Sequence, residues 1–369
     1  MAVTHRLYSC DDHLDIYNVP RDLWSRRLPE RLREVGPRVV ERDGLAWWVA
    51  AGRTLGISGN FAGVATERGS EPDDGFRASR PRERLADMDA DGIHASIVYG
   101  PGALTGFPIP DPDLRRAVIR AWNDWSAEEF NAYAPDRLSA LAALPTTSPD
   151  DAIAELQRCA RLGHRGVLVN AHDVVPFTDL GDVTWDRFWS AAEEAGLPVS
   201  FHIGGGSVIG LAEGATWERD GWKIAAYGAV IPIQLDEPLC MMVFSGALER
   251  HPGLRLVLAE AGVGWLPYFL HRMDHTFELH CRQREGQIRT RPSELFRRQV
   301  FATFEEEPLA AQLIPLVGAE RVMWACDYPH PDSTWPHSRK AIEESFGALD
   351  AASLRRITAE NCRELYRLA

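Results

Sequence analysis

The sequence predicts an α/β protein, a (β/α)8 TIM barrel built as a single domain over residues 1–369. The length of 369 residues suits this fold, since eight strand–helix units take roughly 250 residues before insertions. The composition, 45% apolar and 25% charged, is typical of a soluble globular protein. Short apolar runs alternate with longer amphipathic stretches, as repeated βα units around a parallel sheet do.

Eight apolar runs match the eight strands that the barrel requires. Several, such as GVLV and LRLVLA, are almost wholly apolar, as expected for parallel strands covered on both faces. The predicted strands are Arg6–Cys10, Ala95–Tyr99, Leu138–Leu144, Gly166–Val169, Val199–His202, Arg255–Ala259, Val300–Phe304 and Val322–Ala325.

The amphipathic stretches between these runs predict the surrounding helices. Asp150 and Thr184 are predicted N-caps, and Gly163 and Gly196 are predicted helix ends. The predicted helices are Arg82–Ala90, Pro112–Tyr133, Asp150–Leu162, Thr184–Ala195, Pro238–His251, Trp265–Leu279, Pro308–Val317, Ser338–Phe346 and a C-terminal helix near Thr358–Leu368.

Two long segments interrupt this alternation. Residues 18–80 are rich in Trp, Arg, Gly and Pro, and we expect an insertion after strand one that covers the barrel mouth. Residues 204–237 form a second predicted insertion, after strand five. Trp24, Trp47 and Trp48 either line the mouth, which would suit a cyclic or aromatic substrate, or pack the small core of the first insertion.

The charge and the residue types exclude several classes of function. A net charge of −13 argues against nucleic acid or an anionic membrane as partner. No signal peptide and no apolar stretch of membrane-spanning length is found. Six scattered cysteines without a CxxC pair indicate reduced thiols, so we expect a cytoplasmic protein. We expect its partner to be a small-molecule substrate. Only Lys223 and Lys340 are lysines, which leaves few candidates for Schiff-base or P-loop chemistry.

Metal-binding residue types follow several of the predicted strands, in CDDHLD, FHIGGG, LAEAG and ACDYPH. Asp11 and His13 are two residues apart, so both point to the same side of a strand. His202 ends strand five and Asp327 follows strand eight, and all four side chains should converge above the barrel axis. Such a mixed set of imidazoles and carboxylates suits zinc, with manganese or iron next.

Each of these residues also has an ordinary structural explanation. Asp11 and Asp327 could cap turns, and His202 could be a hydrogen-bonded core residue. Asp12 and Asp15 could be solvated loop acids. The coincidence of these residue types at the ends of strands one, five and eight favours the metal site.

Longer motifs resemble a known family. DDH, FH, AEAGVGWLPYFLHRMD and MWACDYPHPDSTWP, with RERLADMDADGIHASIVYG and AENCRELYRL, are similar to the amidohydrolase-related branch of the amidohydrolase superfamily. That branch includes aminocarboxymuconate-semialdehyde decarboxylase and aromatic-acid decarboxylases, beside many hydrolases. The resemblance implies that Asp11, His13, His202 and Asp327 are metal ligands. It also implies a homo-oligomer, with a dimer favoured.

The chain departs from the pattern of that branch at two places. Asp11 stands where many members carry the first histidine of HxH, and an acidic residue there is a known variant. Glu260 stands where the decarboxylases carry a histidine after strand six, so the candidate general base changes from imidazole to carboxylate. Strand four, GVLVN, lacks the lysine that bridges two ions in other members, so we expect one divalent ion, with zinc as the first choice.

Three residues are candidates for proton transfer. Asp327 is either a ligand or the base that accepts a proton from a metal-activated water. His330 either donates a proton to the leaving group or is a hydrogen-bonded loop histidine. Glu260 either acts as a base or orients a ligand histidine.

The first functional hypothesis is a metal-dependent hydrolase that uses activated water on a small cyclic or aromatic substrate. Glu260 tips the balance, because its charge would repel a substrate carboxylate. The alternative is a non-oxidative decarboxylase of an aromatic or muconate-type acid. A third hypothesis, a non-catalytic metal-binding barrel, is disfavoured by the intact set of ligands.

Overall fold

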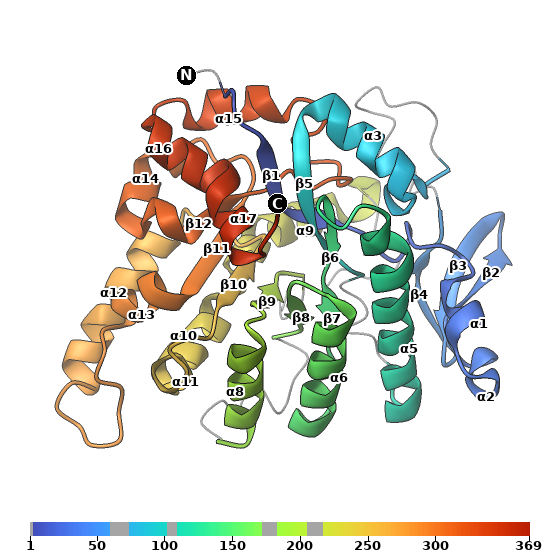
Figure 1. Ribbon diagram of the computed structural model, residues 1–369, viewed down its shortest axis with the longest axis horizontal. Coiled ribbons are helices and arrows are strands. Elements are labelled where there is room, and N and C mark those ends of the chain that lie inside the picture. The colour runs from blue at the N-terminus through green and yellow to red at the C-terminus, as the bar shows by residue number, and fades with distance from the viewer. Residues whose placement is uncertain (1–2, 60–73, 102–108, 172–182, 205–216) are drawn as a thin grey trace.

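A computed structural model describes residues 3–59, 74–101, 109–171, 183–204 and 217–369 (Figure 1). Parallel strands form the wall of a barrel, and their order round the wall follows the chain, with sheets β1-β5-β6 and β7-β8-β9-β10-β11-β12. The strands are β1 (Leu7–His13), β5 (Ile93–Tyr99), β6 (Leu138–Ala140), β7 (Ala142–Ala143), β8 (Val167–Val169), β9 (Val199–His202), β10 (Leu256–Ala259), β11 (Val300–Phe304) and β12 (Val322–Trp324). Each predicted barrel strand is present.

The predicted third strand appears as two pieces, β6 and β7, separated by Leu141. The Leu141 amide donates to the Val98 carbonyl (2.9 Å), whereas the next amide, that of Ala142, donates to the Gly166 carbonyl (3.2 Å). The segment therefore changes partner from β5 to β8 and joins the two sheets into one wall.

The first strand and the segment that follows the last strand close the ring. The Asp327 amide donates to the Asp11 carbonyl (2.9 Å), and the His13 amide donates to the Tyr328 carbonyl (2.8 Å). The Cys326 amide donates to Ser9 Oγ (2.8 Å). We call this paired segment, Ser9–His13 with Cys326–Tyr328, the closing seam, and it places two predicted ligand-bearing segments side by side.

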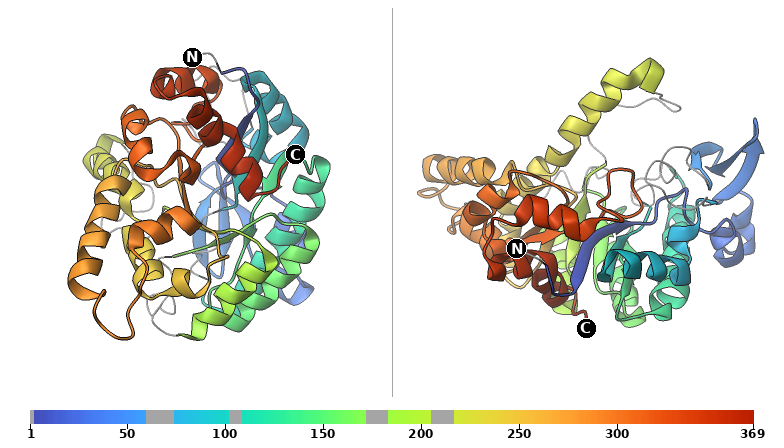
Figure 2. Two further views of the ribbon diagram at one scale, coloured as in Figure 1. Left: turned by 60° about the vertical axis from the view of Figure 1, so that its left-hand side comes forward. Right: turned by 90° about the horizontal axis from the view of Figure 1, so that it is seen from above.

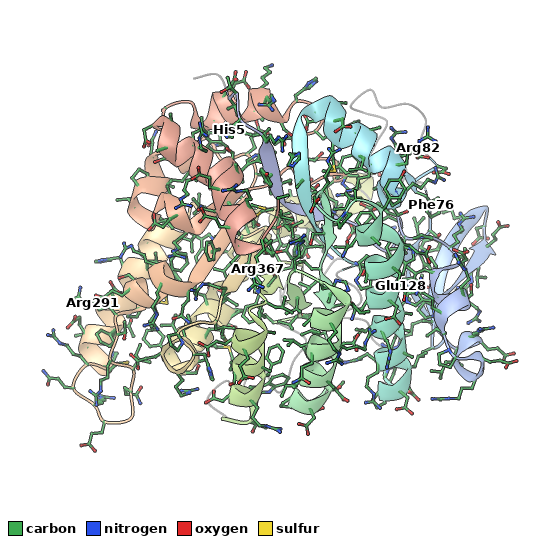
Figure 3. All side chains as sticks on the ribbon, viewed as in Figure 1. His5, Phe76, Arg82, Glu128, Arg291 and Arg367 are labelled. Carbon is green, nitrogen blue, oxygen red and sulfur yellow. The ribbon has the colours of Figure 1, made fainter. Side chains whose placement is uncertain are left out.

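Helices surround the strands (Figure 2). They are α3 (Pro81–Asp91), α5 (Pro112–Trp125), α6 (Pro149–Leu162), α8 (Asp186–Ala195), α10 (Asp236–Phe244), α11 (Ala247–Arg250), α12 (Leu266–His280), α13 (Pro292–Gln299), α14 (Ala310–Val317), α15 (Ser338–Phe346), α16 (Ala351–Arg355) and α17 (Asn361–Leu365). Side chains fill the layer between barrel and helices, while charged residues such as Arg291 and Glu128 lie on the outside (Figure 3).

Some details of the helices differ from the sequence predictions. Ser148, not Asp150, caps α6, because its hydroxyl accepts from the backbone two residues beyond the helix start. Thr184 lies inside a short 3-10 turn before α8, whose N-cap position is Trp185. Gly163 and Gly196 end their helices in the left-handed conformation, as predicted.

The insertion after β1 contains two short helices, α1 (Leu23–Arg27) and α2 (Glu30–Arg33), and an antiparallel sheet of β2 (Arg38–Arg42), β3 (Leu45–Ala50) and β4 (Arg53–Ile57).

Two of its tryptophans pack inward. Trp24 and Trp48 are fully buried and meet edge to face, with ring centroids 4.9 Å apart. The Trp24 indole donates to the Val118 carbonyl of α5 (3.2 Å). These two residues therefore pack the base of the insertion and do not line a substrate pocket. Residues 60–73 lie outside the described residues, so the predicted cover over the mouth stays a prediction.

The segment after β9 continues into α9 (Trp217–Val230) and the 3-10 turn η5 (Ile231–Ile233), while residues 205–216 lie outside the described residues. α9 extends away from the barrel (Figure 2, right). Its Trp222 is 71% exposed.

Two predictions about the chain as a whole can be compared with the structure. All six cysteines are unpaired, as expected. Within the ranges that the structure describes, no helix has the length and apolar character needed to cross a membrane.

Candidate metal centre

The four predicted ligands lie at the carboxyl ends of their strands and face one another. Asp11 and His13 come from β1, His202 ends β9, and Asp327 follows β12. His13 Nε2 lies 3.5 Å from Asp11 Oδ1 and 3.0 Å from Asp327 Oδ1. His202 Nε2 lies 3.5 Å from Asp11 Oδ1. The structure thus brings together four side chains that are up to 316 residues apart in the sequence.

One atom of each of these side chains is buried without a hydrogen-bond partner among the described residues. These atoms are Asp11 Oδ1, His13 Nε2, His202 Nε2 and Asp327 Oδ1. An unsatisfied buried polar atom is costly and rare, so four around one point require an explanation. A cation at that point would satisfy all of them, and two imidazoles with two carboxylates suit a divalent transition metal. The residues present fit such an ion.

The other polar atoms of these side chains are held by neighbours. His202 Nδ1 lies 2.8 Å from the Ile203 carbonyl, so this nitrogen carries the proton and Nε2 keeps its lone pair for a metal. Asp11 Oδ2 accepts from Thr303 Oγ1 (2.8 Å). Thr303 was not predicted as a site residue, because its only signal in the sequence is one hydroxyl in the apolar strand VFATF.

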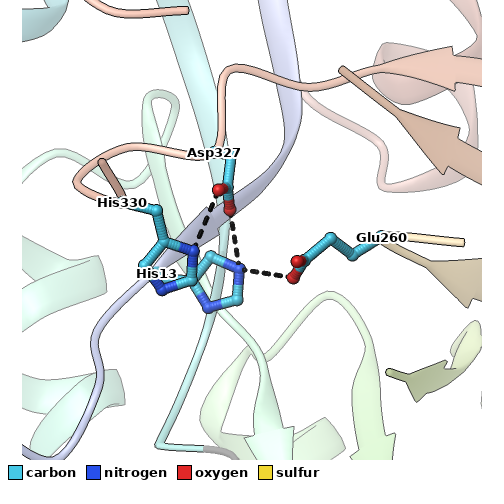
Figure 4. A group of neighbouring side chains, drawn as sticks. All are labelled: His13, Glu260, Asp327 and His330. Carbon is cyan, nitrogen blue, oxygen red and sulfur yellow. Dashed lines mark hydrogen bonds and ion pairs between the residues drawn. The ribbon is translucent and has the colours of Figure 1, made fainter. Parts of the chain in front are cut away.

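Glu260, the first residue after β10, faces the same point (Figure 4). Its Oε2 lies 3.2 Å from His202 Nε2 and 3.4 Å from His13 Nε2. The backbone of Glu260 is left-handed (φ +53°), as is that of Asp327 (φ +66°). Non-glycine residues adopt this conformation at an energetic cost, and such strain concentrates at functional sites.

His330 is held between two carboxylates. Its Nδ1 lies 2.9 Å from Asp327 Oδ2 and its Nε2 lies 2.7 Å from Asp15 Oδ2. Burial lowers the pKa of His330, but the Asp327 and Asp15 carboxylates raise it more, so this pKa lies well above its ordinary value. Asp15 is therefore not a solvated loop acid, and His330 is more than a loop histidine with one hydrogen bond.

The metal-free site also shifts the pKa values of two candidate ligands. Burial and His330 lower the pKa of His13, but Asp327 and Glu260 raise it more, to about 10. Burial raises the pKa of Asp327, but His330 and His13 lower it more, to about 2. A proton on His13 thus offsets the carboxylate charge around it, and a divalent cation would do the same.

Asp12 is also buried, which contradicts its interpretation as a solvated acid. Its Oδ2 accepts from Arg84 Nη2 (3.1 Å), and its Oδ1 accepts from Ser9 Oγ (2.7 Å). Arg84 is fully buried and donates to the His13 carbonyl (3.1 Å) as well. In DDH, the outer residues thus face the centre, while Asp12 anchors β1 to α3.

A cavity of about 280 Å³ opens beside this centre. Its polar end is formed by His13, His202, Glu260 and His330, with Asp15 beside them, and its apolar walls by Tyr99, Leu168, Val169, Ile203 and Ile231. Among the described residues, its lining contains no arginine and no lysine, and Asn170, the residue after β8, contributes to it.

Comparison with known proteins identifies the family. Residues 22–368 match the family described as Amidohydrolase. The chain belongs to this family. It is 32% identical over 261 residues to gamma-resorcylate decarboxylase of Rhodococcus jostii, covering 67% of this chain and 76% of that protein. It is 25% identical over 325 residues to 2-amino-3-carboxymuconate-6-semialdehyde decarboxylase of Dictyostelium discoideum, covering 84% and 81%.

A solved structure with the same fold is a dihydroxybenzoic acid decarboxylase from Polaromonas sp. JS666, with bound manganese and the inhibitor 2-nitroresorcinol. It has a TM-score of 0.67 and 19% identity, and the match covers 99% of this chain and 98% of that one.

These findings confirm the family and branch that the motifs indicated, the TIM barrel and an enzymatic role. They favour the decarboxylase alternative over hydrolysis, which was the first choice from sequence. They support a divalent metal but not zinc in particular.

Proposed function

We propose that this enzyme is a metal-dependent, non-oxidative decarboxylase of a small aromatic acid. One divalent ion is held by Asp11, His13, His202 and Asp327. The observation that carries this proposal is the set of four unsatisfied buried atoms around one point, beside a cavity with apolar walls. The relatedness to gamma-resorcylate decarboxylase supports the reaction type.

Manganese replaces zinc as the first choice of metal. The dihydroxybenzoic acid decarboxylase with the same fold holds manganese. Carboxylate oxygens are also ligands that Mn²⁺ accepts readily, and the lysine-free end of β8 leaves one ion as the expected number. The single domain, the homodimer and the cytoplasmic location remain proposals.

When bound, the metal supplies a Lewis acid that attracts the substrate carboxylate and neutralises its charge. The chain's own residues then orient the ring and exclude water. Leu168, Ile203 and Ile231 offer an apolar wall of a size that suits one aromatic ring. Glu260 then no longer repels a substrate carboxylate, because the cation offsets the negative charge of Glu260.

Decarboxylation breaks the bond between ring and carboxyl carbon, releases carbon dioxide and requires one proton at the ring carbon. His330 lines the cavity and carries a proton at neutral pH, since its pKa is well above the ordinary value. We assign His330 the role of proton donor. Asp15, on its other nitrogen, holds the ring in place, and His330 regains its proton from the solvent after each turnover.

The test is a turnover assay on the manganese-loaded enzyme with 2,6-dihydroxybenzoate and other hydroxybenzoates. We expect release of carbon dioxide, and deuterium at the vacated ring carbon when the reaction runs in D₂O. A matched run in ¹⁸O-labelled water should leave the products unlabelled.

Hydrolysis remains the second candidate, because a carboxylate, Glu260, faces the centre where the related decarboxylases are expected to carry an imidazole. Lactones, amides and cyclic imides therefore belong in the same panel. Incorporation of ¹⁸O into a new carboxyl group, without carbon dioxide, would establish this hydrolase and refute the decarboxylase.

A further inference from the structure

We propose that Glu260 is a fifth protein ligand of the metal and not a general base. This inference rests on the metal site proposed above and goes beyond it, since that site uses four ligands. It assigns a role to the residue at which the chain departs most clearly from the related decarboxylases.

The distances from Glu260 to the two imidazole ligands fit a coordination sphere. Metal–ligand bonds of about 2.1–2.2 Å place neighbouring ligand atoms about 3.0 Å apart in an octahedron and about 3.5 Å apart in a tetrahedron. Glu260 Oε2 lies 3.2 Å from His202 Nε2 and 3.4 Å from His13 Nε2. These separations fall within the 3.0–3.5 Å range found among the other four donor atoms.

The contacts of Glu260 also resemble those of the other ligands. Its Oε2 is directed at the two imidazole nitrogens that have no hydrogen-bond partner among the described residues. Glu260 also lines the cavity, so it is the contacts of Oε2 with the two imidazole nitrogens that favour the ligand role. Figure 4 shows Glu260 and Asp327 approaching His13 from different strands.

The backbone holds Glu260 in this position. Its amide donates to Thr303 Oγ1 (2.6 Å), and the same hydroxyl donates to Asp11 Oδ2 (2.8 Å). One threonine thus positions a carboxylate ligand on β1 and the carboxylate after β10. The left-handed backbone at Glu260 and at Asp327 directs both carboxylates towards the same point.

A fifth ligand changes the metal that the site prefers. Structural and catalytic zinc sites use three or four protein ligands in near-tetrahedral geometry. Two imidazoles and three carboxylates supply five donors, most of them hard oxygens, which suits Mn²⁺ or Fe²⁺ better. We therefore expect the affinity for Mn²⁺ to depend on Glu260 more strongly than the affinity for Zn²⁺ does.

The experiment compares Glu260→Gln and Glu260→Asp with Glu305→Gln as a matched control. Glu305 follows the neighbouring strand β11. Glu305 is partly buried near Asp327 and Glu260, but it belongs to neither group of metal-ligating side chains that the described residues bring together. Mn²⁺ affinity is measured on each full-length protein by competition with a fluorescent chelator, and water bound to Mn²⁺ by proton relaxation.

We expect Glu260→Gln to weaken Mn²⁺ binding about 100-fold, more than most changes to groups that only orient ligands. It should add an exchangeable water to the ion, while Glu260→Asp falls between this variant and the wild type. Glu305→Gln should stay within about threefold of the wild-type affinity. Unchanged Mn²⁺ affinity and relaxation in a folded Glu260→Gln protein overturn the inference but leave the four-ligand site standing. A wild-type protein that binds no divalent metal overturns the proposed function, and this inference with it.

Discussion

The closing seam and helix α9 are opposite kinds of structure at the same end of the barrel. In the seam, Asp11, Asp12 and Asp327 are almost completely buried, and backbone hydrogen bonds join the two segments. In α9, no residue whose side chain is described is buried. The comparison indicates that the metal end of the site is fixed by the fold, whereas α9 has no buried side chain among those described to hold it.

The largest effect is expected at the seam itself. Asp327→Asn removes a charged ligand and the partner of His330, so turnover should fall at least about 1,000-fold, with kcat affected more than substrate affinity. His202→Ala should instead lower metal occupancy in elemental analysis. Near-wild-type turnover of Asp327→Asn would show that the seam carries no chemistry.

Metal binding should depend on pH because metal and proton compete for the same nitrogens. The pKa of His13 in the metal-free protein is raised to about 10, and the His202 pKa is also raised by Asp11 although burial lowers it. His13 is therefore protonated at neutral pH and must release its proton to the solvent on metal binding. Apparent Mn²⁺ affinity should rise by about tenfold or more per pH unit between pH 6 and 8. Competitive titrations at three pH values test this, and a flat profile would contradict the shared site.

The smallest effect is expected on α9. Trp222→Ser alters a side chain that is 71% exposed, so the free energy of unfolding should change by less than about 0.5 kcal/mol. Trp48→Ala, in the first insertion, is the matched control and should cost about 3–5 kcal/mol, because that ring is fully buried. Denaturant unfolding of the two variants gives the measurement. Equal losses would mean that α9 is covered in solution.

The fold and the centre of the site were predictable from the sequence because both depend on local patterns. Apolar runs mark the strands, and Asp11, His13, His202 and Asp327 follow those runs directly. The supporting contacts were not predictable, since Thr303 and Asp11 are 292 residues apart and Asp15 and His330 are 315 apart. The spacing of apolar residues along the sequence does not show which polar side chains will meet one another across the barrel.

The same limit explains the corrections. Asp12 looks like any loop acid until the fold places the buried Arg84 beside it. The tryptophans of the insertion could face the mouth or pack inward, and only tertiary packing buried Trp24 and Trp48. From the sequence, the choice between hydrolysis and decarboxylation depended on Glu260 alone. Its negative charge favoured hydrolysis only because the positive charge of the metal ion was left out.

The closing seam also has a consequence for how the enzyme is made. Asp11 and Asp327 meet only through pairing of the first strand with the segment after the last, so an emerging chain lacks the Asp327 ligand until the segment after β12 has left the ribosome. Metal loading is then a late step, open to the ions present after synthesis rather than during it. An ion that binds only the closed barrel also favours closure by mass action, so supply of the metal during expression governs the yield of native enzyme.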